Sequence, residues 1–561
     1  MMQAFKKAAA LTAAALFLYS CQKPVFVPEK ENVQGSTDEV GVYEDGLYVT
    51  ENGSGGFTGA DWKDAMSAEQ FRSLVVSGEI EAGTTVHLAH GCYSLSTASE
   101  RSPKLTKSIT LKGGYISGIY TQYPDKYPVY LTGATDWHIA EIPSGVELTL
   151  DGVGFTGGTG SEDKGTVCIN GGTLRISNAV IFNNYSPYAA GAIQITNGGR
   201  LEATSCVIRN NVARSGGAIS VDSAESSCIM SNCNVTANLA HENGGAVRIF
   251  AGTVKIEGCT FSGNESVKEA GGAFCLEGGG KLECINTVFD GERTGYRGAL
   301  LGFGGDDTQA LFNGCILDNC HSIQSSALFY HSSGKSKLYL NACTLKDCNI
   351  DEKYGTIAVL NNADLSLGFN NCSMTGAYST FNNANSQQCC WFNINSVGRL
   401  TISNSSLIGV PRSAQKELPK YGFLRFNGND VDAALFNNII VSTSQSGCSI
   451  YGGDTQTDLT ITGLYNRMSP VSTQVAGTFE YRLGEGDSSD MFASDFPELE
   501  WDGKTWIWEN TTMMTPTASV NAAIQAYDAD FYTWLSSIGA LGKDCYGNPR
   551  GENSWPGSYQ K

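Results

Sequence analysis

The chain has 561 residues, a formal net charge of −19 at pH 7, and 66 glycines against 14 prolines. This acidic balance argues against nucleic acid and anionic lipid surfaces as the main partners, and it favours solubility. The many glycines favour a fold with frequent tight corners, because glycine tolerates left-handed backbone.

The first 20 residues are predicted to be a lipoprotein signal peptide. Lys6 and Lys7 precede an apolar run over residues 8–19, which is too short to span a bilayer as a permanent helix. Residues 18–21 (LYSC) resemble the lipobox of bacterial lipoproteins, which implies that Cys21 is acylated and becomes the first mature residue. The alternative is an ordinary signal peptide followed by an unrelated cysteine. The resemblance implies an outer-membrane lipoprotein, at the cell surface or extracellular, and the periplasmic face stays open as a location.

Two segments precede the repeats. Residues 21–45 are polar, contain Pro24 and Pro28 and show no period, which predicts a flexible tether. Residues 46–105 are predicted to form an N-terminal cap and the entry to a coil, and residues 83–89 (GTTVHLA) resemble the entry segment of secreted bacterial β-helix lipoproteins. Such a cap would cover a strand edge that could otherwise recruit another chain.

Two short motifs then recur at a spacing of roughly 26 to 29 residues. The first is a small residue, then usually cysteine, then an apolar residue with asparagine soon after, as in residues 205–211 (SCVIRNN) and 258–264 (GCTFSGN). The second is GGA followed by an apolar residue, as at 216–219 and 244–247. The cysteine position of the first motif is occupied by Ala179, Cys206, Cys233, Cys259, Thr287, Cys315, Cys343 and Cys372.

Residues 106–470 are therefore predicted to form a parallel β-helix. Apolar residues alternate within each copy, as at Val254 and Ile256, which is the period of a strand rather than of a helix. A unit of this length cannot bury a core alone, so the copies must stack, one per turn of a coil. The leucine framework of a leucine-rich horseshoe and the repeat length of a propeller blade are both missing.

The repeated cysteines and asparagines are predicted to be structural. A position that accepts alanine, threonine and cysteine selects a small inward side chain, so reduced, stacked cysteines are favoured over disulfides. A metal site is the least favoured reading, since no Cys-x-x-Cys or Cys/His spacing occurs. Stacked asparagines at a corner would satisfy backbone groups that no strand pairing reaches.

The pairing of GGA-[ILV] with [FIV]-x-x-N resembles the repeat of polymorphic outer-membrane proteins. It is carried by residues 208–211 (IRNN) with 217–219 (GAI), and the match extends over about residues 174–300. The resemblance implies a right-handed β-helix of the kind found in adhesins and autotransporter passengers. That family's C-terminal membrane barrel is not visible in the sequence, and a lipid anchor would take its place.

Residues 471–561 depart from the repeat and are predicted to form a C-terminal capping region. They contain Trp501, Trp506, Trp508 and Trp534, together with a short helical pattern over residues 519–535. Large aromatic side chains in a non-repeating terminus fit a segment that buries the last turn.

No catalytic residue, cofactor or metal is predicted. Parallel β-helices host polysaccharide lyases and glycoside hydrolases, so a carbohydrate-active enzyme on this scaffold is the alternative function. However, neither a calcium cluster with a basic residue nor a pair of carboxylates stands out along one strand position. The acidic pairs, such as Asp306 with Asp307, are more typical of solvated turns.

The favoured function is adhesin-like binding of a surface glycan, or of a host or bacterial protein, by a lipid-anchored monomer. Between each asparagine and the next GGA lies a short variable loop, and stacking would bring these loops onto one face. Aromatic and arginine side chains there could stack on sugars or anchor a protein. The alternative is that the loops vary because nothing constrains them. The candidate ligand-binding residues are Tyr185, Tyr188, Arg214, Arg293, Tyr296, Arg297 and Tyr354.

Overall fold

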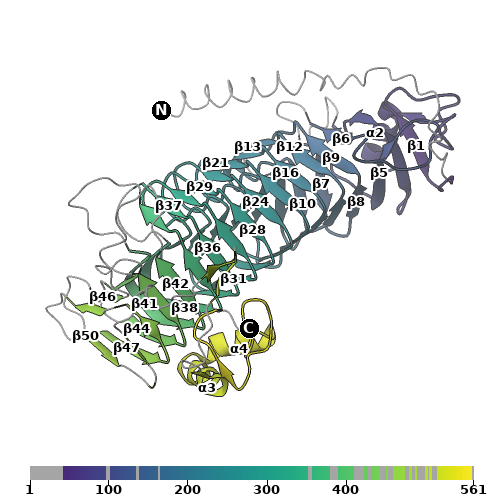
Figure 1. The fold of residues 1–561 in the computed structure, drawn as a ribbon. Coiled ribbons are helices and arrows are strands. Elements are labelled where there is room, and N and C mark those ends of the chain that lie inside the picture. The colour runs from purple at the N-terminus through teal and green to yellow at the C-terminus, as the bar shows by residue number, and fades with distance from the viewer. Residues whose placement is uncertain are drawn as a thin grey trace. The chain divides into compact units, whose positions relative to one another are not determined.

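The computed structural model describes most of the chain between residues 42 and 558 (Figure 1). The gaps are 97–101, 134–137, 162–163, 352–356, 380–389, 410–422, 427–430, 443–449, 453–458, 470, 474–478, 483–484, 486, 489–499, 503 and 508–514. The predicted signal peptide and most of the tether, including Cys21, lie outside the described residues. The chain divides into two compact units. We call them the N-terminal unit (residues 1–241 with 246–248) and the C-terminal unit (residues 242–245 with 249–561).

The N-terminal unit is a parallel β-helix, as the sequence predicts. Equivalent residues stack from one turn to the next. For example, Leu174 pairs with Leu201, and Leu201 pairs with Cys228 of the following turn; all three side chains point inward and are buried. Its first sheet contains β3 (Thr85–Ala89), β5 (Ile109–Tyr115), β7 (Ala140–Pro143), β8 (Glu147–Asp151), β10 (Val167–Asn170), β11 (Thr173–Ser177), β14 (Ile193–Thr196), β15 (Arg200–Thr204), β18 (Ile219–Val221) and β19 (Ser227–Ser231). The second contains β4 (Gly91–Tyr93), β6 (Val129–Thr132), β9 (Val153–Thr156), β12 (Val180–Phe182), β16 (Val207–Arg209) and β20 (Asn234–Thr236), and the third β13 (Tyr185–Ala189), β17 (Val212–Ser215) and β21 (Leu239–Ala240).

The start of the N-terminal unit is closed by β1 (Leu47–Thr50), β2 (Met66–Ser67) and α2 (Ala68–Ser77). β1 pairs with both β2 and β3, so this segment continues the first sheet beyond the coil. Ser67 begins α2 with a capping box, and Gly78 ends it with a φ of 75°. Tyr48 and Trp62 form a buried aromatic cluster with Tyr115.

The C-terminal unit has the same architecture. Its first sheet contains β23 (Thr253–Glu257), β26 (Phe274–Leu276), β27 (Lys281–Ile285), β30 (Leu301–Phe303), β31 (Thr308–Asn313), β34 (Phe329–His331), β35 (Ser336–Asn341), β38 (Ala358–Asn370), β41 (Phe392–Ser403), β43 (Leu424–Phe426), β44 (Val431–Phe436), β46 (Ile450–Gly452), β47 (Leu459–Leu464), β49 (Val471–Thr473) and β50 (Phe479–Arg482). The second contains β24 (Thr260–Ser262), β28 (Val288–Asp290), β32 (Ile316–Asp318), β36 (Thr344–Lys346), β39 (Ser373–Thr375), β42 (Ser406–Gly409), β45 (Ile439–Ser442) and β48 (Arg467–Met468). The third contains β25 (Glu265–Ser266), β29 (Arg293–Thr294), β33 (His321–Ser322), β37 (Asn349–Ile350) and β40 (Tyr378–Ser379).

The asparagine of the repeat builds a buried ladder, which confirms its predicted structural role. Asn211 donates from its backbone N–H and from Nδ2 to Oδ1 of Asn238, at 3.0 Å in each case. Asn184 makes the same pair of bonds to Oδ1 of Asn211, at 3.1 and 2.9 Å. Each ladder residue follows a residue with left-handed backbone, such as Asn210 with a φ of 55°. At this corner of each turn, one residue supplies the left-handed backbone and the next satisfies the backbone N–H groups.

The cysteines of the repeat are small inward side chains, as predicted. Cys206 and Cys233 are buried thiols, and the backbone N–H of Cys206 donates to Sγ of Cys233 at 3.4 Å. The hydrogen bond with Cys233 and burial both raise the pKa of the Cys206 thiol. A thiol with a raised pKa holds little thiolate at neutral pH, so Cys206 is an unreactive packing group.

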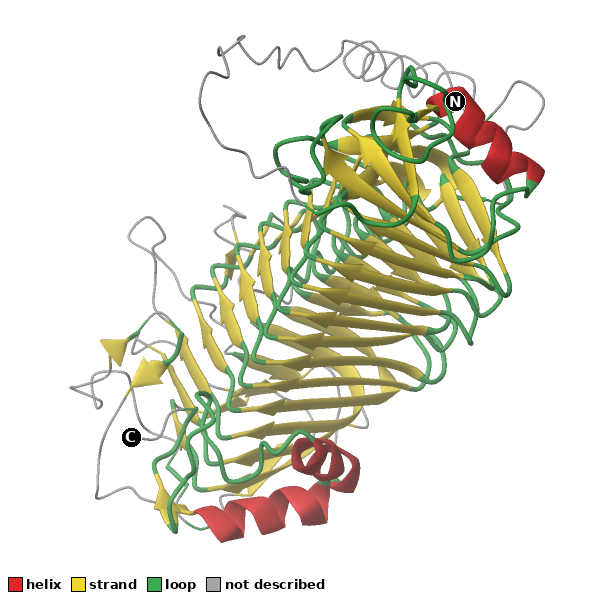
Figure 2. Ribbon diagram, turned by 90° about the vertical axis from the view of Figure 1, so that its right-hand side faces the viewer, coloured by secondary structure: helices red, strands yellow, loops and turns green. Residues whose placement is uncertain are grey.

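The C-terminal segment packs along the side of the C-terminal unit's coil (Figure 2). The helix predicted over residues 519–535 is two helices, α3 (Thr517–Tyr527) and α4 (Ala529–Ser537), which meet at Asp528. The remaining pieces are the short strands β51 (Glu500–Trp501), β52 (Trp506–Ile507), β53 (Thr515–Pro516) and β54 (Asn553–Ser554). Val520, Ile524, Phe531 and Leu535 pack on Tyr339, Ala434 and Phe436, which lie on the outer face of the first sheet. Within the described part of the chain, no helix has the length and apolarity to cross a membrane.

Candidate functional site

The predicted ligand-binding residues of the N-terminal unit lie on its third sheet. Tyr185 and Tyr188 are half-buried on β13, and Arg214 is exposed on the neighbouring β17. Burial raises the pKa of Tyr185. Their role in ligand binding stays a prediction.

In the C-terminal unit, two of the predicted residues form a compact aromatic and arginine cluster. The Arg297 guanidinium lies 4.7 Å from the ring centre of Tyr296 and 5.2 Å from that of Tyr330, and its Nη1 donates to the Tyr330 hydroxyl at 3.4 Å. Arg293 lies exposed on β29, in register between Glu265 and His321. Tyr354 is outside the described residues. Because Arg297 already stacks on both tyrosines, these rings are partly occupied within the chain.

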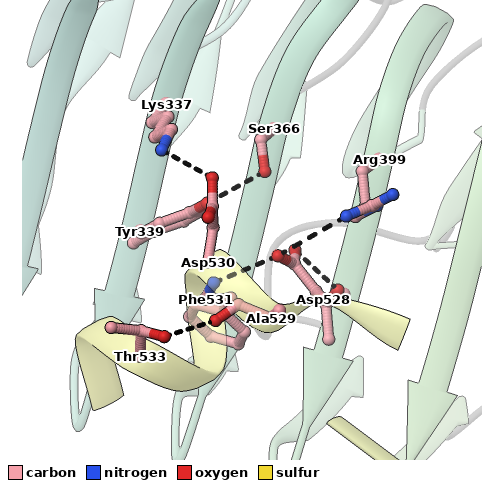
Figure 3. Close-up of polar contacts among 10 residues, drawn as sticks. Lys337, Tyr339, Ser366, Arg399, Asp528, Ala529, Asp530, Phe531 and Thr533 are labelled. Carbon is pink, nitrogen blue, oxygen red and sulfur yellow. Dashed lines mark hydrogen bonds and ion pairs between the residues drawn. The ribbon is translucent and has the colours of Figure 1, made fainter. Parts of the chain in front are cut away.

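A hollow lies on the C-terminal unit, between α4 and the outer face of its first sheet. Figure 3 shows the polar contacts of several residues that line it, among them Lys337, Arg399 and Asp528. This cleft has a volume of about 500 Å³. That volume falls within the usual range for small-molecule sites. It is lined by Lys281, Asp307, Thr308, Gln309, Lys335, Ser336, Lys337, Leu365, Ser366, Gly398, Arg399, Asp528 and Asp530.

The wall formed by α4 is positioned by one glycine of the sheet. Gly368 of β38 lies under the Phe531 ring, and a Cβ at this position would come within 2.5 Å of Phe531 Cδ2 and Cε2. Phe531 also packs against Tyr339, with ring centres 5.0 Å apart. The missing side chain at Gly368 therefore creates the recess in which α4 is seated.

Asp528 fixes the beginning of α4. It is fully buried, and its Oδ1 accepts the backbone N–H of Phe531 at 3.0 Å while its Oδ2 accepts the Thr401 hydroxyl at 3.2 Å. The Arg399 guanidinium lies 3.9 Å away. Burial raises the pKa of Asp528 although these partners act in the opposite direction. This is the geometry of a helix N-cap, so the main role of Asp528 is to stabilise the start of α4.

The floor of the cleft is a single column of outward side chains on consecutive strands. Lys281 of β27 pairs with Gln309 of β31, and Gln309 pairs with Lys337 of β35. Lys337 in turn pairs with Ser366 of β38, and Ser366 with Arg399 of β41. Residues in register on parallel strands point to the same side. The column therefore alternates charged and neutral groups from one strand to the next, and we call it the basic column.

The acidic residues of the cleft neutralise only part of this positive charge. Lys337 forms an ion pair with Asp530 at 2.7 Å, and the hydrogen bond and charge of Lys337 lower the pKa of Asp530. Lys281 and Lys335 are exposed, and neither forms an ion pair with another described residue. Two ammonium groups are thus available to an anionic ligand.

On the N-terminal unit, the same outer face of the sheet carries charges that are paired with each other. Arg175 contacts both Glu147 and Glu202, and Arg200 contacts Glu202. The available cations of the cleft are therefore not a general property of this sheet.

Sequence reasoning missed the basic column, because each of its residues on its own resembles an ordinary solvated side chain. A signal was nevertheless present. Lys281, Lys337 and Arg399 each stand directly before a buried leucine of the repeat. Gln309 and Ser366 hold the same place, before the buried residues Ala310 and Leu367. Aligning the copies on this inward residue would have shown a basic residue in every second copy from Lys281 to Arg399.

The cleft offers groups for ion pairs and hydrogen bonds. Among the described residues, no group of three or more histidine, cysteine, aspartate or glutamate side chains is arranged to hold a metal ion. Three aspartates line the cleft: Asp528 caps α4, Asp530 pairs with Lys337, and Asp307 is a third carboxylate in the lining. The remaining lysines, hydroxyl groups and amide suit a ligand that carries both anionic groups and hydroxyls.

Comparisons with known proteins find distant likenesses only. No protein-family model matches the chain, and no curated protein sequence matches it. Among solved structures, pectate lyase Pel9A is 13% identical with a TM-score of 0.31, over 64% of this chain and 80% of its own. The alginate lyase AlyF-OU02 in complex with G6 is 12% identical with a TM-score of 0.37, over 85% and 94%. XylC with xylose is 11% identical with a TM-score of 0.29, over 92% and 98%. At these values the likeness assigns no activity, and the resemblance to polymorphic outer-membrane proteins stays a prediction.

Proposed function

We propose that this protein is a lipid-anchored β-helix that binds an anionic polysaccharide in the cleft beside α4. The observation that carries the proposal is the basic column, in which Lys281, Lys337 and Arg399 line one open hollow of a protein whose net charge is −19. A group of cations on an otherwise acidic protein creates a local positive potential, which attracts an anionic ligand to that place. Binding is the favoured function, and carbohydrate-active catalysis is the alternative.

A glycan fits the cleft better than a compact anion such as phosphate. The three cations of the column lie on alternate strands across a span of five strands, and they do not converge on one point. Between them stand Gln309 and Ser366, whose amide and hydroxyl groups can exchange hydrogen bonds with sugar hydroxyls. A long ligand with repeated acidic groups uses all of these positions together.

The proposal is tested by titrating the purified protein with acidic and neutral polysaccharides of matched length, using calorimetry. We expect acidic chains to bind and neutral chains to bind much more weakly. Replacing Lys281, Lys337 or Arg399 with alanine should weaken binding about fivefold each, since a partly exposed ion pair contributes about 1 kcal/mol. Binding should also weaken as salt is added, because such pairs are screened.

Lys255→Ala is the matched control. Lys255 lies on β23 in the same sheet, outside the cleft, and contacts Glu283 at 3.7 Å. We expect this variant to bind like the wild type. Equal losses in Lys255→Ala and Lys281→Ala would mean that only overall charge matters and would reject the cleft.

Two other outcomes of the same assay favour the other hypotheses. Loss of binding on replacing Tyr185, Tyr188 and Tyr296 with alanine, with the lysine variants unaffected, would place recognition on the loops. Release of unsaturated products or new reducing ends from an acidic polysaccharide, with or without calcium, would make the protein an enzyme. The binding proposal expects neither result.

The anchor is a separate part of the proposal. We expect Cys21 to carry lipid, which would place the cleft near the cell surface or in the periplasm. Metabolic labelling with a radioactive fatty acid should label the wild type and leave Cys21→Ser unlabelled. Equal labelling of both proteins, or none of either, contradicts the lipoprotein assignment. Replacing Cys92, a free and exposed cysteine of the folded region, serves as the control.

A further inference from the structure

We infer that the ligand is an extended glycan that lies across the strands of the basic column and presents one anionic group toward it for every two sugar rings. This inference rests on the proposed function and adds to it the charge spacing of the ligand and its direction. The chain would run along the stacking direction of the strands in the C-terminal unit.

The first argument is the alternation of the column. In order along the stack, its side chains are Lys281, Gln309, Lys337, Ser366 and Arg399, so a cation occurs on every second strand. The intervening Gln309 and Ser366 are neutral hydrogen-bonding groups. A ligand that matches this order alternates an acidic ring with a ring that offers only hydroxyl groups.

The second argument is the distance. Neighbouring strands lie ~4.8 Å apart, so cations on alternate strands lie ~9.6 Å apart. One ring of an extended pyranose chain advances by a length similar to the strand spacing. In chains linked through equatorial bonds, successive rings are turned over, and groups on the same side recur at every second ring. The column and such a chain therefore share their repeat.

An extended acidic peptide does not share this repeat. Its side chains on one side recur every ~6.8 Å, or two residues of a strand. Against cations ~9.6 Å apart, its carboxylates can reach the first and third cations, at ~20.4 Å against ~19.2 Å, but they miss the middle cation by ~2.8 Å. The geometry thus favours a glycan over an acidic peptide.

The third argument comes from Asp530, whose carboxylate forms an ion pair with Lys337, the middle cation of the column. Its Oδ2 lies 2.7 Å from Nζ of Lys337, and its side chain is 67% exposed. The Lys337 ammonium is therefore accessible to a carboxylate from the solvent side. A ligand carboxylate would exchange with Asp530 at this position. Removing the Asp530 charge should consequently strengthen binding.

The experiment compares three hexasaccharides of β-1,4-linked glucose: a neutral one, one in which every second ring is a glucuronate, and one in which every ring is a glucuronate. Polyglutamate matched in charge to the fully acidic chain is the fourth probe. We expect the alternating and fully acidic sugars to bind within about threefold of each other, because the additional carboxylates face away from the column. The neutral sugar and polyglutamate should bind at least about tenfold more weakly.

Two variants make the spacing itself the variable. Adding lysine at the neutral positions, as Gln309→Lys with Ser366→Lys, should raise affinity for polyglutamate more than for the fully acidic sugar, which carries the same charge. Asp530→Asn should strengthen binding of the alternating sugar about threefold, whereas Asp290→Asn on β28, in the second sheet, should not change it. The ratio of affinities for two probes is unaffected by a general gain of positive charge.

The inference and the proposed function fail in different ways. If affinity follows total charge, so that polyglutamate and the fully acidic sugar bind equally and far above the alternating sugar, the spacing inference is wrong while the anion site remains. If no acidic sugar binds, or binding does not depend on Lys281 and Lys337, the proposed function is wrong as well.

Discussion

Replacing Phe289 with alanine is expected to lower the free energy of unfolding of the C-terminal unit by about 3–5 kcal/mol, the usual range for a fully buried phenylalanine. Phe289 lies on β28 inside the coil and is completely buried. Its ring packs against three others, with centres 5.3 Å from Phe261, 5.7 Å from Phe274 and 6.1 Å from Phe312. Because stacked turns contact only their neighbours, a cavity here weakens the coil on both sides.

The measurement is urea unfolding followed by far-ultraviolet circular dichroism and intrinsic fluorescence. Phe289→Leu is the control, since it keeps most of the volume and should cost less than about 1.5 kcal/mol. The two variants should differ in their urea midpoints with similar slopes. A midpoint for Phe289→Ala close to that of the wild type would contradict the stacked aromatic core.

The residues that build the coil could be predicted from sequence because their environment repeats. Cys206 and Asn211 occupy fixed places in each copy, so one inward position and one corner position were recognisable without coordinates. Burial of the cysteine and the hydrogen bonds of the asparagine follow directly from stacking. Periodicity converts a long-range contact into a local pattern, which is why these predictions were correct.

The packing of the C-terminal helices could not be predicted in the same way. Phe531 meets Gly368 and Tyr339, which lie far away in the sequence and belong to no shared motif. A glycine in a repeat of many glycines carries no visible sign that a ring will cover it. The aromatic side chains of the terminus suggested a cap on the last turn. Of the four tryptophans, Trp534 packs against the hydrophobic cluster on the side of the coil, and Trp508 lies outside the described residues.

The candidate site required register as well as periodicity. Tyr296 and Arg297 were predicted as ligand contacts because aromatic and basic residues stood in a variable loop, and the structure shows them stacked on each other beside Tyr330. Lys281 and Lys337 were overlooked because single lysines are common on surfaces. Their meaning depends on pairing across β27, β31 and β35, which single copies of the repeat do not reveal.

Glu292 interrupts the asparagine ladder with a buried carboxyl group. Its Oε2 accepts the backbone N–H of Asn264 at 3.0 Å, and its Oε1 accepts Nδ2 of the same residue at 3.2 Å. Burial raises the pKa of Glu292 well above 4.5, and the nearby charge of Asp290 acts in the same direction. In the next turn, Cys320 takes the ladder position and also lies next to Glu292.

The sign of the pH dependence follows from this raised pKa. Below pH 4.5, Glu292 is protonated in both the folded and the unfolded chain. As the pH rises, the unfolded chain releases the proton first, so the folded state loses stability until its own pKa is passed. The slope cannot exceed about 1.4 kcal/mol per pH unit for this one proton. We expect Glu292→Gln, which cannot ionise, to remove this component and to be more stable than the wild type at pH 8.

The comparison is made by urea unfolding of both proteins at pH 5 and pH 8. The urea midpoint of Glu292→Gln should exceed that of the wild type by more at pH 8 than at pH 5. Glu292→Asn, which restores the amide of the ladder, should behave in the same way, since both amides keep an acceptor for Asn264 without a charge. Glu257→Gln, at an exposed position of β23, is the control and should leave the pH dependence unchanged. If Glu292→Gln lowered the midpoint at pH 8 more than at pH 5, the buried group would be ionised in the folded state, and the bonds from Asn264 would then outweigh the cost of burying its charge.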